Sequence, residues 1–244
     1  MPLPPPQAQL RRYRVIDNRP IADGIFALKI SPQKVEDQIP PFEAGQWVNL
    51  QVLKPDGSVW QKRAYTIASA PSESTSYLEF GIKIEGPFSQ QASKLQPGDP
   101  LLVQGPWGAF TLPTGATRLV MLAGGIGITP FRSMVREVCL QARPIDICLL
   151  YSSRTCREAA YLNELEQLTR ACFRLRLVSI CTREPQAPAQ ELRRIDASLL
   201  DTVVGNYALG QFLLCGPRAF MDDLQALLAH RGVEPQRIKR ELFS

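Results

Sequence analysis

Histidine and closely spaced cysteines are nearly absent from this chain of 244 residues. His230 is the one histidine, so the sequence indicates neither a histidine-rich metal site nor a Cys-His-Asn nucleophile. The six cysteines, at positions 139, 148, 156, 172, 181 and 215, are never closer than eight residues, which excludes a C-x-x-C knuckle for zinc or an iron–sulfur cluster. We expect no metal site, reduced and mostly buried thiols at five of the six positions, and chemistry that depends on a bound cofactor.

Long apolar runs and a strong excess of one charge are also missing. No segment approaches the about 20 apolar residues that span a bilayer, and Met1–Pro6 lacks the basic-then-apolar order of a signal peptide. We therefore expect a cytoplasmic protein without an integral membrane segment, with a disordered proline-rich lead-in over residues 1–12. The net charge of +5 is scattered, so it does not predict nucleic-acid binding; it suits phosphate-rich cofactors or an acidic protein partner.

Short extended runs separated by turn signals fill residues 13–114. Turn sequences such as Lys54–Gly57 and Gln96–Asp99 break the chain at short intervals. Evenly spaced short strands of this kind predict a small antiparallel barrel with six strands. The expected strands are Tyr13–Ile16, Ile25–Ile30, Trp47–Leu53, Arg63–Ile67, Tyr77–Ile84 and Leu101–Gln104.

From residue 115 to residue 244, apolar strands alternate with helices. This rhythm predicts a second domain, a doubly wound parallel sheet that binds ligands at the carboxyl ends of its strands. The expected strands are Leu119–Ala123, Ile145–Tyr151, Arg174–Ile180 and Gln211–Leu214. The expected helices are Thr129–Gln141, Tyr161–Thr169 and Pro217–His230.

Two motifs in the first half combine residue types that suit a phosphate-bearing cofactor. In Arg63-Ala64-Tyr65-Thr66, a spacing of two puts the Arg63 fork and the Tyr65 ring on one face of a strand, although exposed strands often carry both residue types. Gly86-Pro87-Phe88-Ser89 precedes a helix expected from Gln90, where a glycine and free N–H groups favour an anion. Ser89 equally suits an N-cap that binds no ligand.

Two motifs in the second half follow apolar strands and open helices. Gly124–Pro130 has the context of a pyrophosphate turn but is not G-x-G-x-x-G, because Pro130 stands where the last glycine would be. A tight strand-to-helix turn without a ligand needs fewer glycines than this segment has. Cys215-Gly216-Pro217 repeats the arrangement and puts Cys215 at a strand end, where the ligand crevice opens; a buried structural cysteine is the alternative.

In this order and spacing, the motifs resemble those of the ferredoxin–NADP reductase superfamily, from about Tyr13 to Ser244. Arg63–Thr66 is similar to its R-x-Y-[ST] flavin signature, and Gly105–Phe110 to the G-P-x-G-x-F motif that ends its barrel. The last four residues, Glu241–Ser244, resemble the family's E-x-aromatic ending, except that they end in Phe243-Ser244 and not in tyrosine. The resemblance implies a flavoprotein enzyme whose barrel binds FAD or FMN and whose second domain brings NAD(P)H against the flavin.

The resemblance also implies roles for individual residues. Thr66 would lie near flavin N5, Cys215 beside the nicotinamide C4, and Glu241 would tune proton or electron transfer; these three are the expected catalytic residues. Arg63 and Ser89 would hold flavin phosphates, Tyr65 would flank the isoalloxazine, and Phe243 would cover its other face. Gly86–Ser89 resembles the pyrophosphate segment of the family, which favours FAD over FMN. The expected cofactor-binding residues are Arg63, Ala64, Tyr65, Thr66, Lys83, Gly86, Pro87, Phe88, Ser89, Gly124, Gly125, Gly127, Thr129, Pro130, Ser153, Arg154, Arg183, Arg194, Cys215, Gly216, Pro217 and Phe243.

The choice between NADPH and NADH depends on Arg154, Arg183 and Arg194, which together could surround a 2′-phosphate. No acidic residue occupies Ser152–Thr155 to favour a free 2′-hydroxyl, so we favour NADPH, although surface arginines are common. Single electrons would then pass to a ferredoxin or flavodoxin. The alternatives are the reductase component of an oxygenase system, a free-flavin or ferric reductase, and a non-catalytic interaction protein with this fold. We expect a monomer.

Overall fold

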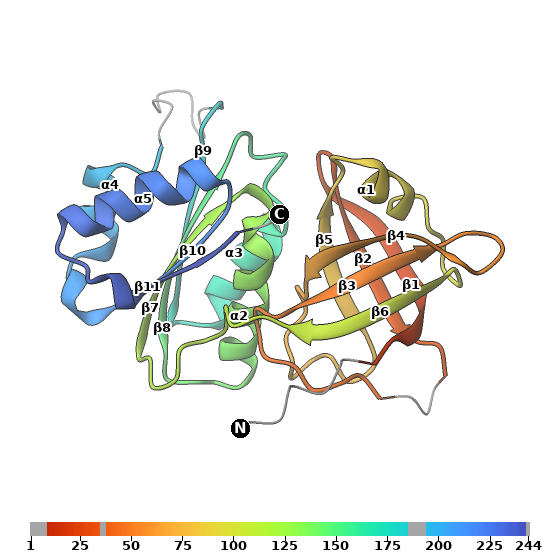
Figure 1. Ribbon diagram of the computed structural model, residues 1–244. Coiled ribbons are helices and arrows are strands. Elements are labelled where there is room, and N and C mark those ends of the chain that lie inside the picture. The colour runs from red at the N-terminus through yellow and green to blue at the C-terminus, as the bar shows by residue number, and fades with distance from the viewer. Residues whose placement is uncertain (1–8, 35–37, 185–193, 243–244) are drawn as a thin grey trace, which may run out of the picture.

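A computed structural model describes residues 9–34, 38–184 and 194–242 of the chain (Figure 1). The chain forms two units that lie side by side, an antiparallel sheet from the first half and a parallel sheet covered by helices from the second. Among the described residues, no helix has both the length and the apolar character required to cross a bilayer.

The first unit is the predicted six-stranded antiparallel barrel, with strand order β4-β3-β6-β1-β2-β5. Every second side chain of a strand points into the core, as Tyr13 and Val15 of the first strand do. The same core holds Phe26, Leu50 and Phe80. β1 begins two residues before the expected boundary at residue 13. The elements are β1 Arg11–Ala22, β2 Ile25–Pro32, β3 Trp47–Leu53, β4 Val59–Thr66, β5 Leu78–Lys83, α1 Pro87–Ala92 and β6 Pro100–Trp107.

The second unit is the predicted doubly wound domain, a five-stranded parallel sheet with order β11-β10-β7-β8-β9. Phe131 and Leu165 pack α2 and α3 on one face, and Leu200 and Leu224 pack α4 and α5 on the other. The chain winds outward in opposite directions from β7 and β10, so the crevice for a ligand opens where these strands end. The elements are β7 Arg118–Gly124, α2 Ile128–Leu140, β8 Asp146–Ser153, α3 Leu162–Ala171, β9 Leu175–Cys181, α4 Ala197–Val204, β10 Gln211–Cys215, α5 Arg218–His230 and β11 Ile238–Glu241.

Three features differ from the sequence-based expectations. The first helix begins at Pro87 and not at Gln90, because proline fits the first helical turn and Gly86 serves as the N-cap. α4 and β11 were not expected as elements. The prediction of reduced thiols at all positions but one was wrong for Cys156 and Cys181, which form a disulfide with Cα atoms 5.6 Å apart. Cys139, Cys148, Cys172 and Cys215 are free.

Arg132 of α2 joins the two units. Its side chain is 5% exposed, and Nη1 donates a hydrogen bond of 2.7 Å to the Ala68 carbonyl oxygen of the barrel. Nε donates to both carboxylate oxygens of Glu164, at 3.1 and 3.0 Å, and Nη2 lies 3.5 Å from Glu79. The guanidinium also lies 4.3 Å from the ring centroid of Tyr161. These partners replace the water that a buried cation loses.

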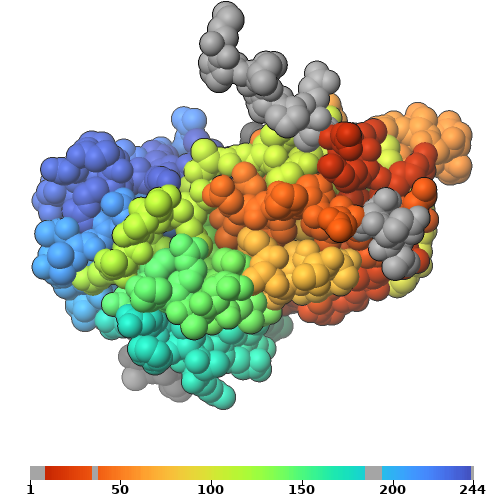
Figure 2. Space-filling model, turned by 90° about the horizontal axis from the view of Figure 1, so that it is seen from below, coloured from red at the N-terminus to blue at the C-terminus, as the bar shows by residue number. Residues whose placement is uncertain are grey.

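Two neighbours on α2 extend this contact. Ser133 Oγ donates to the Ser69 carbonyl oxygen at 2.7 Å, and Arg136 pairs with Glu73 of the segment between β4 and β5. Figure 2 shows this side of the molecule, with the green α2 region directly against the yellow-orange β4–β5 segment. The relative position of the two units is therefore set by buried, directional hydrogen bonds.

We expect Arg132→Met to lower the free energy of unfolding by about 3–5 kcal/mol, because Glu79 stays buried while losing a cationic partner. Glu79 is 1% exposed, and Lys29, at 3.4 Å, remains beside it. Chemical denaturation followed by circular dichroism measures the change. Adding Glu79→Gln should restore part of the loss, since it removes the uncompensated charge. An Arg132→Met protein as stable as the parent would contradict this account.

Candidate active site

Two adjoining clefts lie where the units meet. The first has a volume of about 300 Å³, and the second, at the carboxyl ends of the parallel strands, about 400 Å³. They share the lining residues Lys83, Glu85 and Ile126, so the two clefts are neighbours. The first is lined by Arg63, Ala64, Tyr65, Thr66, Gly81, Lys83, Glu85, Gly86, Pro87, Phe88, Ser89, Ile126 and Thr129. The second is lined by Ile25, Lys83, Glu85, Gly124, Gly125, Ile126, Gly127, Ser152, Ser153, Arg154, Glu158, Thr182, Gly216, Pro217 and Phe220.

Tyr65 forms an aromatic wall of the first cleft. Its ring lies 5.6 Å from that of Phe88, tilted by 33°. Burial raises the pKa of Tyr65 to about 12, against the opposing effect of the nearby Arg63 charge. The phenol therefore stays protonated at neutral pH and keeps a hydrogen-bond donor. Arg63 is exposed on the same strand; one Nη donates to the Lys62 carbonyl oxygen at 3.1 Å, which leaves further donors of the fork for a ligand.

Ser89 closes the turn that precedes α1. Its Oγ accepts hydrogen bonds from the N–H groups of Glu85 and Gly86 at 3.0 Å and donates to the Gly86 carbonyl oxygen at 3.0 Å. The hydroxyl thus shapes the rim of the first cleft through the backbone. The N-cap itself is Gly86, three residues before Ser89. Direct contact between Ser89 and a phosphate stays a prediction.

The Gly124–Pro130 turn packs tightly against the end of β10. A Cβ on Gly127 would lie 2.4 Å from the Cys215 carbonyl oxygen, so only glycine fits there without movement. A Cβ on Gly124 would lie 3.0 Å from the Phe220 ring. Thr129, 3% exposed, donates from Oγ1 to the Ile126 carbonyl oxygen at 3.1 Å and lines the first cleft from the side of the second unit. Pro130 is buried in the first turn of α2. The glycines therefore let two strand ends approach where the clefts adjoin.

Cys215 and Glu241 are neighbours in the parallel pairing of β10 with β11. Cys215 is 0% exposed, and burial, with a smaller contribution from the Glu241 charge, raises the pKa of its thiol well above the usual value. The thiol is therefore neutral at physiological pH. Burial also raises the pKa of Glu241. Cys215 does not itself line either cleft, whereas Gly216 and Pro217, directly after it, line the second.

Of the remaining expected site residues, Thr66 is 5% exposed and lines the first cleft. Arg154 is exposed at the far end of the second cleft, and the Arg183 N–H donates to its carbonyl oxygen at 2.8 Å. Arg194 precedes α4 and is not among the described residues that line either cleft. Phe243 lies outside the described residues.

Sequence reasoning missed Glu85, Glu158, Thr182 and Phe220, which all line the second cleft. Thr182 follows the last residue of β9, so the rule that ligands bind at strand ends could have found it. Glu158 has no such signal, because it reaches the cleft from a loop five residues after β8.

Comparison with known proteins matches both halves of the chain. Residues 15–112 match the oxidoreductase FAD-binding domain family, and residues 121–226 match the oxidoreductase NAD-binding domain family. Over 172 residues the chain is 36% identical to ferredoxin–NADP reductase B of Sorangium cellulosum, which covers 70% of this chain and 69% of that protein. The chain belongs to the ferredoxin–NADP reductase superfamily.

Two further relatives show the range of the superfamily. The glycine betaine monooxygenase reductase subunit of Chromohalobacter salexigens is 32% identical over 83% of this chain, which spans 56% of that protein. The crystal structure of a Neisseria gonorrhoeae ferredoxin NADP+ reductase with bound FAD and NADP superposes with a TM-score of 0.78 at 24% identity, over 96% of this chain and 99% of that one. The present reductase is thus an FAD- and NAD(P)-binding oxidoreductase.

The cleft residues of the reductase fit both cofactors. The first cleft offers a flat ring at Tyr65, which suits an isoalloxazine, and the Arg63 guanidinium, which suits the phosphates of FAD; Lys83 lies there too, paired with Glu85. In the second cleft, Gly125 has a φ of +55° and a Cβ there would meet no atom within 4 Å, so the backbone leaves open space beside the glycine turn. Open space beside backbone N–H groups at the start of α2 suits a pyrophosphate.

We expect Gly127→Ala to raise KM for the pyridine nucleotide by roughly 10- to 100-fold while FAD content stays normal, because the added methyl group displaces the turn from Cys215. Steady-state kinetics and flavin absorbance measure the two effects. Gly210→Ala is the matched control, since the nearest atom to a Cβ there is 3.5 Å away. Loss of FAD in Gly127→Ala, or an unchanged KM, would contradict this role.

Proposed function

We propose that this reductase takes hydride from NADPH and passes electrons singly to a small ferredoxin- or flavodoxin-type carrier. The observation that carries the proposal is that the two clefts are neighbours and share the lining residues Lys83, Glu85 and Ile126. Bound FAD supplies the conversion of a hydride into two single electrons. Residues of the first cleft would hold the flavin and residues of the second the nicotinamide nucleotide, so that the two rings could meet as hydride transfer requires.

Each expected catalytic residue has a role that suits its surroundings. Thr66, buried at the edge of the first cleft, would donate or accept a hydrogen bond near flavin N5. Cys215, a buried neutral thiol, would lie behind Gly216 and Pro217, which line the second cleft, on the side where we place the nicotinamide. Glu241, whose carboxyl pKa is raised by burial, would hold a proton near that thiol. Phe243 would cover the flavin face on the nicotinamide side.

Support for NADPH comes from Arg154 at the exposed end of the second cleft, with Arg183 bonded to its backbone. A guanidinium pairs well with a 2′-phosphate. Glu158, on the same cleft, opposes this preference, because a carboxylate repels the phosphate and favours a free ribose hydroxyl. We favour NADPH because the exposed Arg154 guanidinium lines this cleft, and Arg183 lies on the segment bonded to its backbone.

Support for a small carrier comes from the 36% identity to a ferredoxin–NADP reductase and from the net charge of +5, which favours an acidic partner. The 32% identity to a monooxygenase reductase subunit supports the second candidate, the reductase component of an oxygenase system. A free-flavin or ferric reductase is the third. A monomer in the cytoplasm is part of the proposal.

Anaerobic titration of the purified, flavin-loaded protein with NADPH and separately with NADH tests the proposal. We expect fast bleaching of the flavin with NADPH and slower bleaching with NADH. The reduced protein should then reduce ferredoxin or flavodoxin in single-electron steps. Bleaching by neither nucleotide would refute the reductase function, and reoxidation by free FMN alone would favour a free-flavin reductase.

We expect Arg154→Ala to raise KM for NADPH by on the order of tenfold, because the binding free energy of one charge-assisted hydrogen bond is lost. KM for NADH should change little. Glu158→Gln is the matched variant and should have the opposite effect: it should lower KM for NADPH, because it removes a charge that repels the 2′-phosphate. Steady-state kinetics with both nucleotides measures the ratio. Equal effects of Arg154→Ala on NADPH and NADH would remove its 2′-phosphate role.

A further inference from the structure

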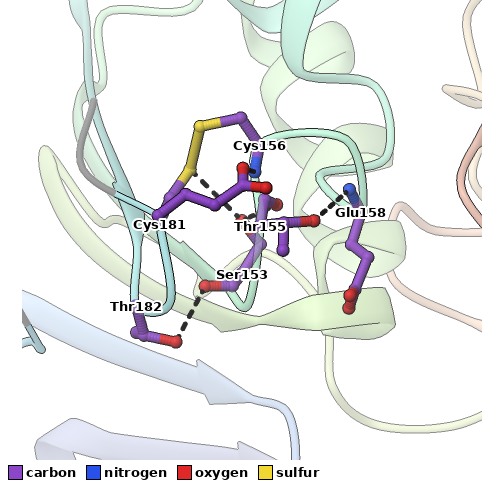
Figure 3. Close-up of a disulfide and its surroundings, with 7 residues drawn as sticks. Ser153, Thr155, Cys156, Glu158, Cys181 and Thr182 are labelled. Carbon is purple, nitrogen blue, oxygen red and sulfur yellow. Dashed lines mark hydrogen bonds between the residues drawn. A yellow bond between two sulfur atoms is a disulfide. The ribbon is translucent and has the colours of Figure 1, made fainter. Parts of the chain in front are cut away.

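The Cys156–Cys181 disulfide lies near Ser153 and Thr182 (Figure 3), and these two residues line the second cleft together with Arg154. Cys181 is the last residue of β9, and Cys156 lies in the loop that follows β8. The bond therefore joins the two segments that carry this end of the nucleotide cleft. Neither the family motifs nor the proposed hydride transfer uses it.

Hydrogen bonds continue the pairing of these segments past the ends of the strands. Ser153 pairs with Cys181 in the last register of β8 and β9. Beyond it, the Thr182 N–H donates to the Ser153 carbonyl oxygen at 2.9 Å, and the Arg183 N–H donates to the Arg154 carbonyl oxygen at 2.8 Å. Figure 3 shows the disulfide on one side of Ser153 and the Thr182 hydroxyl, bonded to the Ser153 carbonyl oxygen at 3.2 Å, on the other.

The loop residues next to the disulfide are tied to the same framework. Ser153 Oγ donates to the Thr155 carbonyl oxygen at 2.9 Å and lies 3.9 Å from Cys181 Sγ. The Cys156 N–H donates to Glu184 at 3.2 Å. Arg154 lies between Ser153 and these anchored residues, so its backbone position depends on a loop that the disulfide closes. Without the covalent bond, the loop would be held by hydrogen bonds alone, and one of these, from the Cys156 N–H to Glu184, is exposed to water, which can replace it.

We propose that the Cys156–Cys181 disulfide positions the loop carrying Arg154 for the phosphate-bearing adenosine end of the nucleotide, and that its reduction weakens nucleotide binding. The effect is greater for NADPH than for NADH, which rests on the proposed function. Cys156 and Cys181 are positioning residues, because they act through Arg154 and Thr182. The nicotinamide end of the cleft, at Gly127 and Pro217, is built by other strands and keeps its geometry.

Reduction of this bond is a thiol–disulfide exchange with a dithiol. One thiolate of the dithiol attacks a sulfur and forms a mixed disulfide, and its second thiol then displaces the protein sulfur. Two electrons and two protons pass to the protein, which ends with two thiols, while the dithiol becomes a disulfide. Cys156 is exposed and Cys181 is 4% exposed, so the dithiol reaches the bond from the side of Cys156.

The test compares the flavin-loaded protein before and after treatment with dithiothreitol, followed by removal of the reagent under nitrogen. Thiol titration in denaturant should give four thiols before treatment and six after it. The reduced protein should show a KM for NADPH that is higher by about fivefold or more, a smaller rise for NADH, and an unchanged kcat and flavin content. If the disulfide were purely structural, its reduction would change thermal stability but would not raise KM for NADPH while kcat stayed unchanged.

Two variants complete the test. Cys156→Ser with Cys181→Ser should show the high KM without treatment and no further response to dithiothreitol. Cys139→Ser with Cys172→Ser is the matched control, since it removes two free thiols and keeps the disulfide; it should respond as the parent does.

The proposal would be overturned if the reduced protein, with six free thiols, had the same KM for NADPH as the disulfide-bonded protein, with four. The proposal would also be overturned if the purified protein had six free thiols and oxidised dithiothreitol did not convert two of them into a disulfide. Failure of the proposed function looks different: a parent that reacts with NADH alone refutes the NADPH preference. A rise in KM for NADH on reduction would, in that case, still support the positioning role of the disulfide.

Discussion

The buried guanidinium of Arg132 is the interaction on which the arrangement of this reductase depends. A charge at 5% exposure is stable only where the surrounding groups replace its hydration, and here the replacements come from both units. Ala68 and Glu79 belong to the barrel, and Glu164 belongs to the α/β domain. Because the hydrogen bonds are directional, they fix orientation as well as contact.

This fixed orientation has a direct effect on the clefts. α2 carries Arg132 in its second turn and Thr129 in its first, and Thr129 lines the first cleft together with Tyr65 and Thr66. A Cβ on Gly81 of β5 would lie 2.9 Å from both Thr129 and the Tyr161 ring, so the barrel approaches the second unit as closely as its backbone permits. The same helix thus holds the domains together and supplies a wall of the site.

Local sequence patterns predicted the fold well. Alternating burial and turn residues marked the six barrel strands, and the alternation of apolar strands with helices marked the doubly wound sheet. Motifs with short spacing, such as Arg63–Thr66 and Gly124–Pro130, indicated most of the residues that line the clefts.

What the sequence did not predict depends on contacts between distant segments. The disulfide joins residues 25 positions apart whose proximity follows only from the pairing of β8 with β9. Glu158 reaches the second cleft from a loop without regular periodicity, and Ser89 bonds to a backbone turn whose helix starts earlier than expected. Composition and spacing carry no information about such placements, because side-chain direction is decided by tertiary packing.

The neutral, fully buried state of Cys215 bears on how the protein withstands peroxide. Oxidants attack thiolates, and the conversion of a thiol to sulfinic acid requires both ionisation and access. Cys215 has neither, since its thiol pKa is raised and its exposure is 0%. Sulfur at the junction of β10 and β11 is therefore protected from irreversible oxidation, and the Cys156–Cys181 pair, already oxidised, has no thiol left to lose. Cys139 and Cys172, free thiols with partial exposure, do not share this protection.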